Sequence, residues 1–408
     1  MLYDILRTIL TPAIYILMLF NTKKGKFFKK RLYQNFSILK KEEYIWVHCS
    51  SVGEINLSEI LIKKLLQERK ERILITLFTD TGLEVAKSKF KNNDRVDIFY
   101  FPLDDKRNIK EILSKIKLKY LLIIETEIWP NLIKIASKYA KVIMVNGRIS
   151  DKSFKRYYKI KGYLTKLFTY ISKFYMQTAE DSTRIITLGA PKDKVETLGN
   201  LKFDIEFPNY TLEDRKQFKE FLGIENRKVF TAGSSRTGEY EILLEVFKNL
   251  KDTILILVPR HIEKTSQIEE LLKKNNQKYK KYSEINEKNI EKTDIIIIDT
   301  IGILRKIYSI SDIAFVGGTF VNIGGHSLLE PLFYGKTPIF GPYIQNVKEI
   351  SQDILKYEIG YKVQNVDEFL RAISSVKKNQ ENSQEIIKKL FKENMKTADK
   401  IIQKIEKI

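Results

Sequence analysis

Three carboxylates in the first half of the chain follow short apolar runs. Glu54 comes after the run 44–49 and a turn of small residues, and Glu125 and Glu127 come after the run 120–124. In open α/β sheets, ligands bind beyond the carboxyl ends of the strands, and a helix N-terminus favours a negative charge. We therefore expect Glu54 to be an exposed acid that acts as a general base. The alternative is that Glu54 only caps its helix, as in a Ser-x-x-Glu capping box.

The other two acids and one lysine are further candidates. Glu125 and Glu127 are two residues apart on an extended segment, so they face the same way. One of them is expected to orient an acceptor or to stabilise a positive charge, and the other is free to cap a helix. Lys202, in the motif GNLKFD, is placed to meet a leaving phosphate; the alternative is an ordinary solvated lysine.

Loops in the second half have the composition of a phosphate and ribose site. Ser234 and Ser235 lie in a glycine and serine loop after one apolar run, and Pro259, Arg260 and His261 end the next run. An arginine offers planar, permanently charged donors to phosphate. Two glycine turns follow the run 313–317 and precede a helix that begins near Ser327. Glu330 in that helix suits the hydroxyls of a ribose, and the free N–H groups at the helix start favour phosphate. The alternative for each loop is an ordinary turn between a strand and a helix.

The elements that carry these residues alternate between strand-like and helix-like segments, which predicts parallel α/β sheets. A break near Phe203–Tyr210 contains Pro208 and separates two such series. We therefore expect two Rossmann-like domains, residues 23–205 and 206–408, that face a cleft, with the last helix able to pack back on the first domain. The predicted strands are Ile73–Thr79, Val96–Leu103, Tyr120–Glu125 and Lys141–Asn146, then Val229–Gly233, Thr253–Pro259, Asp294–Asp299, Ile313–Gly317 and Thr337–Phe340.

Charge and composition restrict the partners. Residues 1–205 contain 39 Lys and Arg against 22 Asp and Glu, whereas residues 206–408 contain 33 against 29, so the basic surface belongs to the first half. Such a surface attracts anionic lipid, nucleic acid or a phosphorylated substrate. The single cysteine, Cys49, excludes a disulfide framework within the chain. With three histidines and no spaced ligand cluster, we expect no structural metal.

The first 22 residues read as a membrane anchor. They are mostly apolar, although Asp4, Arg7 and Pro12 make a spanning helix marginal. Six positive charges follow at Lys23, Lys24, Lys26, Lys29, Lys30 and Arg31. These charges are expected to hold the protein at the cytoplasmic side, against anionic headgroups. The segment either spans the membrane or lies in its interface, and the alternative is a core helix of the first domain.

Six motifs occur in order along the chain: HCSSVGE, ETEIWPNL, NGRISDKSF, GNLKFD, PRH and GGHSLLEP. Together they resemble the bacterial Kdo transferases, which transfer 3-deoxy-D-manno-oct-2-ulosonic acid (Kdo) and have the two-domain GT-B glycosyltransferase fold. The resemblance runs from about Tyr44 to Pro342, and the family's N-terminal anchor is also similar.

The resemblance implies an inverting transfer of Kdo from CMP-Kdo to the lipid A precursor (lipid IVA), at the inner membrane and without a metal or other cofactor. By position, Glu54 matches the catalytic base, and Glu125 and Lys202 match positions that stabilise the transition state. The residues that match the CMP site are Arg260, Ile301, Gly302, Ile303, Ser327, Leu328, Leu329 and Glu330, with Glu330 at the ribose.

The chain departs from the family's pattern at three places in the nucleotide loops. Ile303 stands where glutamate is usual, Ser327 where asparagine is usual, and Arg236 with Thr237 where a His-Glu pair is usual. These differences bear on donor specificity. One alternative is therefore another membrane-associated GT-B enzyme with a different donor or glycolipid acceptor. A non-catalytic nucleic-acid-binding module is disfavoured, because the basic residues are not interleaved with aromatics in a recognisable nucleic-acid motif.

Overall fold

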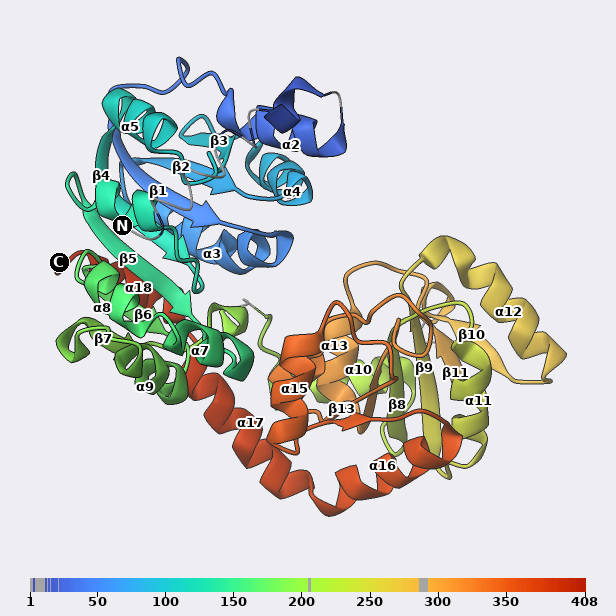
Figure 1. Ribbon diagram of the computed structural model, residues 1–408. Helices are drawn as coiled ribbons and strands as arrows, with labels where there is room; N and C mark the ends of the chain where they lie inside the picture. Colours follow the sequence, from blue (N-terminus) through green and yellow to red (C-terminus); the bar gives the residue numbers. More distant parts are fainter. Residues whose placement is uncertain are drawn as a thin grey trace. The chain divides into compact units, whose positions relative to one another are not determined.

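The computed structural model describes residues 3, 12, 14, 16–20, 22–204, 207–285 and 293–408. It divides into two compact units, each described here by itself (Figure 1). Unit 1 comprises Met1–Ile205 and Asn394–Ile408, and unit 2 comprises Glu206–Glu393. Each unit is built on a parallel sheet with helices on both faces, so the predicted α/β class with two parallel-sheet domains is confirmed. The expected cleft between them stays a prediction.

Unit 1 contains a seven-stranded parallel sheet with the order β3-β2-β1-β4-β5-β6-β7. Its strands are β1 (Glu43–Cys49), β2 (Arg72–Leu77), β3 (Val96–Tyr100), β4 (Lys117–Ile124), β5 (Lys141–Gly147), β6 (Lys173–Met176) and β7 (Val195–Thr197). Its helical segments are α2 (Lys23–Leu32), α3 (Val52–Glu68), α4 (Asp80–Phe90), α5 (Lys106–Lys115), α6 (Pro130–Ala136), α7 (Asp151–Tyr158), α8 (Lys161–Phe168), α9 (Ala179–Thr187), η1 (Lys192–Lys194), η2 (Leu201–Phe203) and α18 (Thr397–Ile405).

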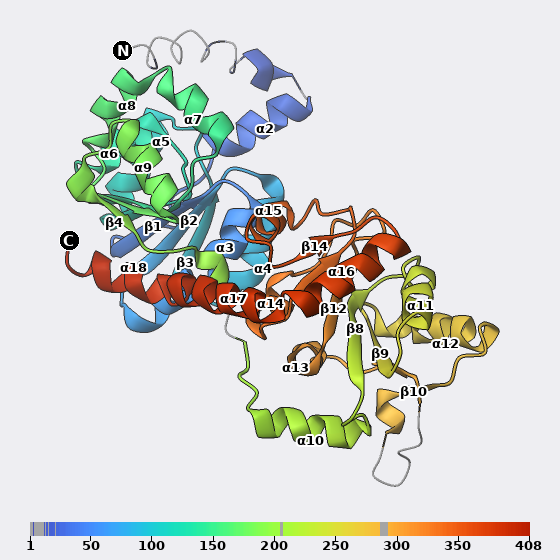
Figure 2. The ribbon, with the colours of Figure 1, turned by 90° about the horizontal axis from the view of Figure 1, so that it is seen from below.

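Helices cover both faces of this sheet, which explains why its central strands are almost continuously apolar. On one face, α3, α4 and α18 pack against alternate residues of β1 such as Ile45 and Val47. On the other face, α5, α6, α8 and α9 pack against Tyr44 and Trp46. Figure 2 shows α18 as the last helix before the C-terminus. Its apolar residues, such as Ile401, belong to the core of unit 1.

Unit 2 contains a second seven-stranded parallel sheet, with the order β10-β11-β9-β8-β12-β13-β14. Its strands are β8 (Lys228–Ser235), β9 (Thr253–Pro259), β10 (Tyr279–Lys281), β11 (Ile295–Ile297), β12 (Ile313–Val316), β13 (Pro338–Phe340) and β14 (Tyr361–Lys362). Its helical segments are α10 (Leu212–Leu222), α11 (Tyr240–Lys248), η3 (Ile262–Lys264), α12 (Thr265–Lys274), η4 (Tyr282–Glu284), α13 (Leu304–Ile310), α14 (Leu329–Phe333), α15 (Lys348–Lys356), α16 (Val366–Lys378) and α17 (Gln380–Asn394), which ends in unit 1.

The order of strands places a switch point in each sheet. In unit 1 the chain winds outward from β1 to β3 and then returns to place β4 on the other side of β1; in unit 2, β12 lies beside β8 in the same way. At a switch point, the loops that follow two neighbouring strands run in opposite directions and leave a crevice between them. Ligands of open α/β sheets bind in this crevice. The topology thus identifies the loops after β1 and β4, and after β8 and β12, as the places to search for a site.

The predicted membrane anchor, residues 1–22, lies largely outside the described residues. Among the helices that the structure does describe, none has both the length and the apolar composition needed to cross a membrane. The basic segment that follows forms α2, and Leu19 and Phe20 just before it are 84% and 59% exposed.

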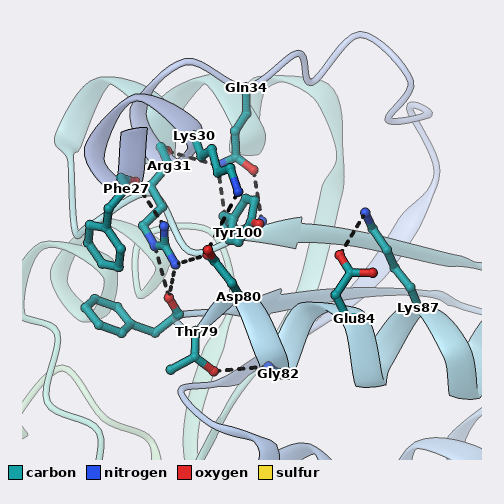
Figure 3. Close-up of polar contacts among 11 residues, drawn as sticks. Phe27, Lys30, Arg31, Gln34, Thr79, Asp80, Gly82, Glu84, Lys87 and Tyr100 are labelled. Carbon is teal, nitrogen blue, oxygen red and sulfur yellow. Dashed lines mark hydrogen bonds and ion pairs between the residues drawn. The ribbon is translucent and has the colours of Figure 1, made fainter. Parts of the chain in front are cut away.

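One of the six charges expected to meet headgroups is not available to them. The Arg31 side chain is fully buried: it donates to Phe78 O at 3.0 and 2.6 Å and to Asp80 Oδ1 at 2.8 Å, and its guanidinium lies 3.5 Å from the centre of the Phe27 ring (Figure 3). The expectation was therefore wrong for Arg31. The guanidinium is needed inside, where it fastens α2 to the start of α4, while Lys23, Lys24, Lys26, Lys29 and Lys30 stay exposed.

Candidate active site

Glu54 lies in the first turn of α3, at the carboxyl end of β1. Ser51 is the N-cap and accepts a hydrogen bond from Glu54 N at 3.4 Å, while the Glu54 carboxylate accepts from Ser50 N at 2.6 Å and from Ser51 Oγ at 3.0 Å. Glu54 is only 8% exposed, so the expectation of an exposed acid was wrong. The carboxylate folds back on the start of its own helix and accepts from the N–H of Ser50, the residue before the N-cap, and not from the N-cap N–H as in a capping box.

Capping does not make Glu54 an ordinary acid. Burial raises the pKa of Glu54, the Ser50 N–H opposes that rise, and the charges of Glu127 and Glu125 add to it, so that the resulting pKa is about 8. The helix N-terminus, which we expected to favour the charge, does not outweigh this burial. A carboxyl group with a pKa near the working pH is suited to accept a proton, and such groups concentrate at functional sites.

The second and third carboxylates follow β4, the strand beside β1. Glu125 has a left-handed backbone (φ +59°), which is uncommon for a residue other than glycine, and its N–H donates to Val145 O of β5 at 2.8 Å. Thr126 ties the same loop to the next strand end, since its Oγ1 donates to Arg148 O at 2.6 Å and accepts from Arg148 N at 3.0 Å. Strain held in place by such contacts is typical of functional loops.

Four of the buried polar atoms without a hydrogen-bond partner in the described part of the chain gather at this same edge. They are His48 Nε2 and Ser50 Oγ at the end of β1, Trp129 Nε1 at the start of α6, and Asn146 Nδ2 at the end of β5. Burial lowers the pKa of His48 to about 3, so the imidazole is neutral at physiological pH. Folded proteins leave few buried polar atoms unpaired, and a group of them marks a place where a ligand or water belongs.

Lys202 lies in the short turn η2, which is held over the ends of β5 and β6. Asn200 caps the turn by accepting from Lys202 N at 3.0 Å, and Asn146 Oδ1 accepts from Leu201 N at 2.9 Å. Gln177 joins the two asparagines: it accepts from Asn200 Nδ2 and donates to Asn146 O. Unit 1 therefore places Glu54, Glu125 and Lys202 at one edge of its sheet, in the segments that follow its strands, although their catalytic roles stay a prediction.

In unit 2, the end of β8 and the loop after β12 touch each other at Gly317. A Cβ atom added there would lie 2.4 Å from Ser234 O and 2.6 Å from Ser235 Cα, so only glycine permits this approach. Ser234 has a left-handed backbone (φ +53°), and both serine side chains are buried. The predicted serine loop and the first glycine turn are thus parts of one structure at the switch point of unit 2.

Glu239 fastens these two loops together. Its carboxylate is fully buried and accepts four backbone hydrogen bonds, each of 2.9 Å, from Arg236, Gly318, Thr319 and Phe320. Burial raises its pKa, and the four N–H donors oppose that rise. The sequence analysis did not select Glu239; its place one residue after a Thr-Gly turn and at the start of a helix was the available signal.

Arg236 stands between two histidines from different loops. Its Nη1 donates to His261 Nε2 at 2.6 Å, and its Nε donates to His326 Nε2 at 3.3 Å. His261 Nδ1 lies 3.0 Å from Glu263 Oε1, so the two ring nitrogens face opposite partners, Glu263 and Arg236. Burial, together with the charges of Arg236 and Arg260, lowers the pKa of His326 to about 4. Ser235, Arg236, His261 and Lys264 line a small cavity here, of about 110 Å³.

The remaining residues predicted to bind the nucleotide differ in how far they are exposed to solvent. Arg260 is exposed at the end of β9, and Ile301 is 80% exposed beside Gly302 and Ile303. Leu328 and Leu329 have buried side chains at the start of α14, so only their backbone groups are available to a nucleotide, and their place in the nucleotide site stays a prediction. Ser327 is half-buried, Pro259 is buried within β9, and Glu330 is paired with Arg305 at 3.2 Å.

Within the described ranges, no group of three or more His, Cys, Asp or Glu side chains is arranged to hold a metal ion. Glu54, Glu125 and Glu127, the three acids after β1 and β4, therefore do not form such a group. The expectation of a reaction without a metal stays a prediction.

Comparison with known proteins gives a family. A family model described as 3-deoxy-D-manno-octulosonic-acid transferase (kdotransferase) matches residues 26–205. A bifunctional glycosyltransferase/methyltransferase of Fusobacterium nucleatum is 52% identical over 406 residues, which cover 99% of this chain and 63% of that protein. The chain therefore spans less than two thirds of that relative's length. Two 3-deoxy-D-manno-octulosonic acid transferases are also similar. That of Haemophilus influenzae is 34% identical over 84% of this chain and 81% of its own length, and that of Aquifex aeolicus is 35% identical over 88% and 94%.

Proposed function

Because the chain belongs to the 3-deoxy-D-manno-octulosonic acid transferase family, we propose that it transfers Kdo from CMP-Kdo to the lipid A precursor. The observation that carries the proposal is the group at the carboxyl edge of unit 1: a buried acid with a pKa of about 8, two further acids after the neighbouring strand, and unpaired polar atoms beside them. The acid is suited to accept a proton and the unpaired polar atoms are suited to bind a ligand, in a chain whose relatives are glycosyltransferases.

In the proposed step, a hydroxyl oxygen of the acceptor attacks the anomeric carbon of Kdo. The hydroxyl proton passes to Glu54 in its ionised form, which is populated as the pH approaches its pKa of about 8; the new carbon–oxygen bond forms, and the bond from the anomeric carbon to the phosphate oxygen of CMP breaks. CMP leaves with the electron pair, and the attack from the opposite side inverts the anomeric centre. Lys202 stabilises the charge that develops on the phosphate, and Glu125 stabilises positive charge on the sugar.

Unit 2 binds the nucleotide in this proposal. Arg236 and Arg260 supply cations at the ends of β8 and β9, and the charge of each is felt at His326. Two histidines hold the Arg236 guanidinium and Glu239 holds its backbone N–H, so the guanidinium is oriented by the histidines before a phosphate arrives. The chain has an arginine where the family's pattern has a histidine. The side chain of this arginine is held by hydrogen bonds to His261 and His326 and does not extend freely into solvent.

The acceptor surface is proposed to be the basic part of unit 1. The exposed lysines of α2 lie next to the exposed Leu19 and Phe20, and α7 has no buried residue and carries Lys152, Lys155 and Arg156. Basic residues beside exposed apolar side chains suit the interface of an anionic membrane and the phosphates of a glycolipid. We therefore place the protein at the cytoplasmic face of the inner membrane.

Mass spectrometry of the acceptor after incubation with CMP-Kdo tests this function. We expect one or more Kdo units on the lipid A precursor. Glu54→Gln should lower the rate about 10²- to 10⁴-fold, the usual contribution of a general base, with CMP affinity unchanged. Glu68→Gln, which removes an exposed carboxylate from the end of the same helix, is the matched control and should keep full activity. Stronger thermal stabilisation by UMP or UDP than by CMP would contradict the proposed donor.

A further inference from the structure

Asn146, at the end of β5, combines three features that packing alone does not explain. It is 1% exposed, its backbone is left-handed (φ +58°), and its Nδ2 has no hydrogen-bond partner in the described part of the chain. Each of the last two features costs free energy at a buried position. A residue that keeps both is a candidate for a role that the folded chain alone does not reveal.

The carboxamide of Asn146 has a fixed orientation. Its Oδ1 accepts from Leu201 N at 2.9 Å, so the amide cannot turn over without breaking this bond. Its backbone oxygen is held as well, by Gln177 Nε2 at 3.1 Å. The strand register slips between Val145 and Gly147, which places Asn146 in a bulge. Bulges frequently re-aim a side chain next to an active site.

Asn146 belongs to the edge that carries the proposed acids. Glu125 N donates to Val145 O, so the left-handed residue after β4 is bonded to the residue that precedes Asn146. Leu201, which the carboxamide holds, precedes Lys202 in the turn η2. Asn146 therefore lies between the loop of Glu125 and the turn of Lys202. Its two unpaired N–H hydrogens can bind only an acceptor atom.

We propose that Asn146 Nδ2 donates a hydrogen bond to an oxygen of a substrate sugar, either a hydroxyl or a carboxylate, bound at this edge. The inference rests on the proposed function, because that function puts a sugar there. The contact would orient the sugar ring against the two acids, with Oδ1 continuing to hold Leu201. Asn146 is then a substrate-binding residue as well as a clamp on the turn η2.

Two substitutions separate these roles. Asn146→Asp keeps an oxygen for Leu201 N and replaces the Nδ2 donor with a negatively charged acceptor oxygen, whereas Asn146→Gly removes the whole side-chain amide and relieves the left-handed strain. Both should lower kcat/KM for Kdo transfer about 10- to 100-fold, the usual effect of one lost hydrogen bond to a polar or charged ligand atom. Tyr175→Phe is the matched control: it also removes a buried polar atom that has no partner in the described part of the chain, but in the core, and should keep wild-type kcat/KM.

The KM values of the Asn146 variants identify which sugar is bound. A raised KM for CMP-Kdo assigns the contact to the donor, and a raised KM for the acceptor assigns it to the acceptor. A folded Asn146→Asp protein whose kcat/KM stays within about twofold of wild type would overturn the inference, even if Asn146→Gly were impaired, because the clamp alone would then account for the residue. Binding of free Kdo, followed by the fluorescence of Trp46 and Trp129, is independent of transfer. If the wild-type protein binds Kdo without transferring it, the proposed function fails, while weaker binding by both variants still supports the inference.

Discussion

Glu54 should make unit 1 less stable as the pH rises. Its pKa is about 8 in the folded protein against an ordinary value of 4.5. Below about pH 4.5 both the folded and the unfolded chain bind the proton, so the residue has no effect. Between that pH and about 8 the unfolded chain releases the proton and the folded chain keeps it, so the free energy of unfolding falls. Above about pH 8 the loss is complete.

The size of the effect follows from the two pKa values. The interval from 4.5 to about 8 corresponds to about 5 kcal/mol at ~1.4 kcal/mol per pH unit. Glutamine has nearly the same shape as the protonated acid and does not ionise, so Glu54→Gln should remove this dependence. The variant should be close to the wild type at pH 5 and more stable by several kcal/mol at pH 9.

The measurement uses the fluorescence of tryptophan during urea denaturation from pH 5 to 9. Both tryptophans of the chain, Trp46 and Trp129, lie in unit 1, so the signal reports that unit. Glu68→Gln is the control and should follow the wild type at every pH. If the difference in free energy of unfolding between the wild type and Glu54→Gln stayed constant over this range, Glu54 would ionise as an ordinary acid. The claim that folding raises the pKa of Glu54 would then be refuted.

Three further predictions concern other parts of the molecule. Glu239→Gln should destabilise unit 2 by about 2 kcal/mol, because the amide nitrogen cannot accept the two N–H groups that one oxygen now binds; circular dichroism should show it while the tryptophan transition stays unchanged. Arg236→Lys should weaken CMP binding about tenfold in calorimetry, since lysine loses the forked donors, and the exposed control Arg371→Lys should not; equal affinities would remove Arg236 from the site. Arg31→Ala should lower the stability of unit 1 by about 2 kcal/mol and speed proteolysis within α2, whereas Lys29→Ala, also on α2 but exposed, should do neither.

Most of the fold was predictable from local patterns. The long apolar runs became β2, β4, β5, β8 and β9, with limits that differ from the predicted ones by a few residues at most. Four strands were not predicted: β6, β7, β10 and β14. They are two to four residues long, too short for an alternation of apolar and polar residues to stand out, and pairing with a neighbouring strand is what makes them strands.

The sequence by itself determined which residue types stand at the ends of strands: acids after two runs of the first half, and serine, glycine and arginine after runs of the second. These are local facts, set by neighbours along the chain. The tertiary structure decided their chemistry. It placed β4 beside β1, so that the charges of Glu125 and Glu127 act on Glu54, and it brought His261 and His326, 25 and 90 residues from Arg236, onto one guanidinium. Burial and charge interactions depend on distance in space, so no pattern along the chain contains them.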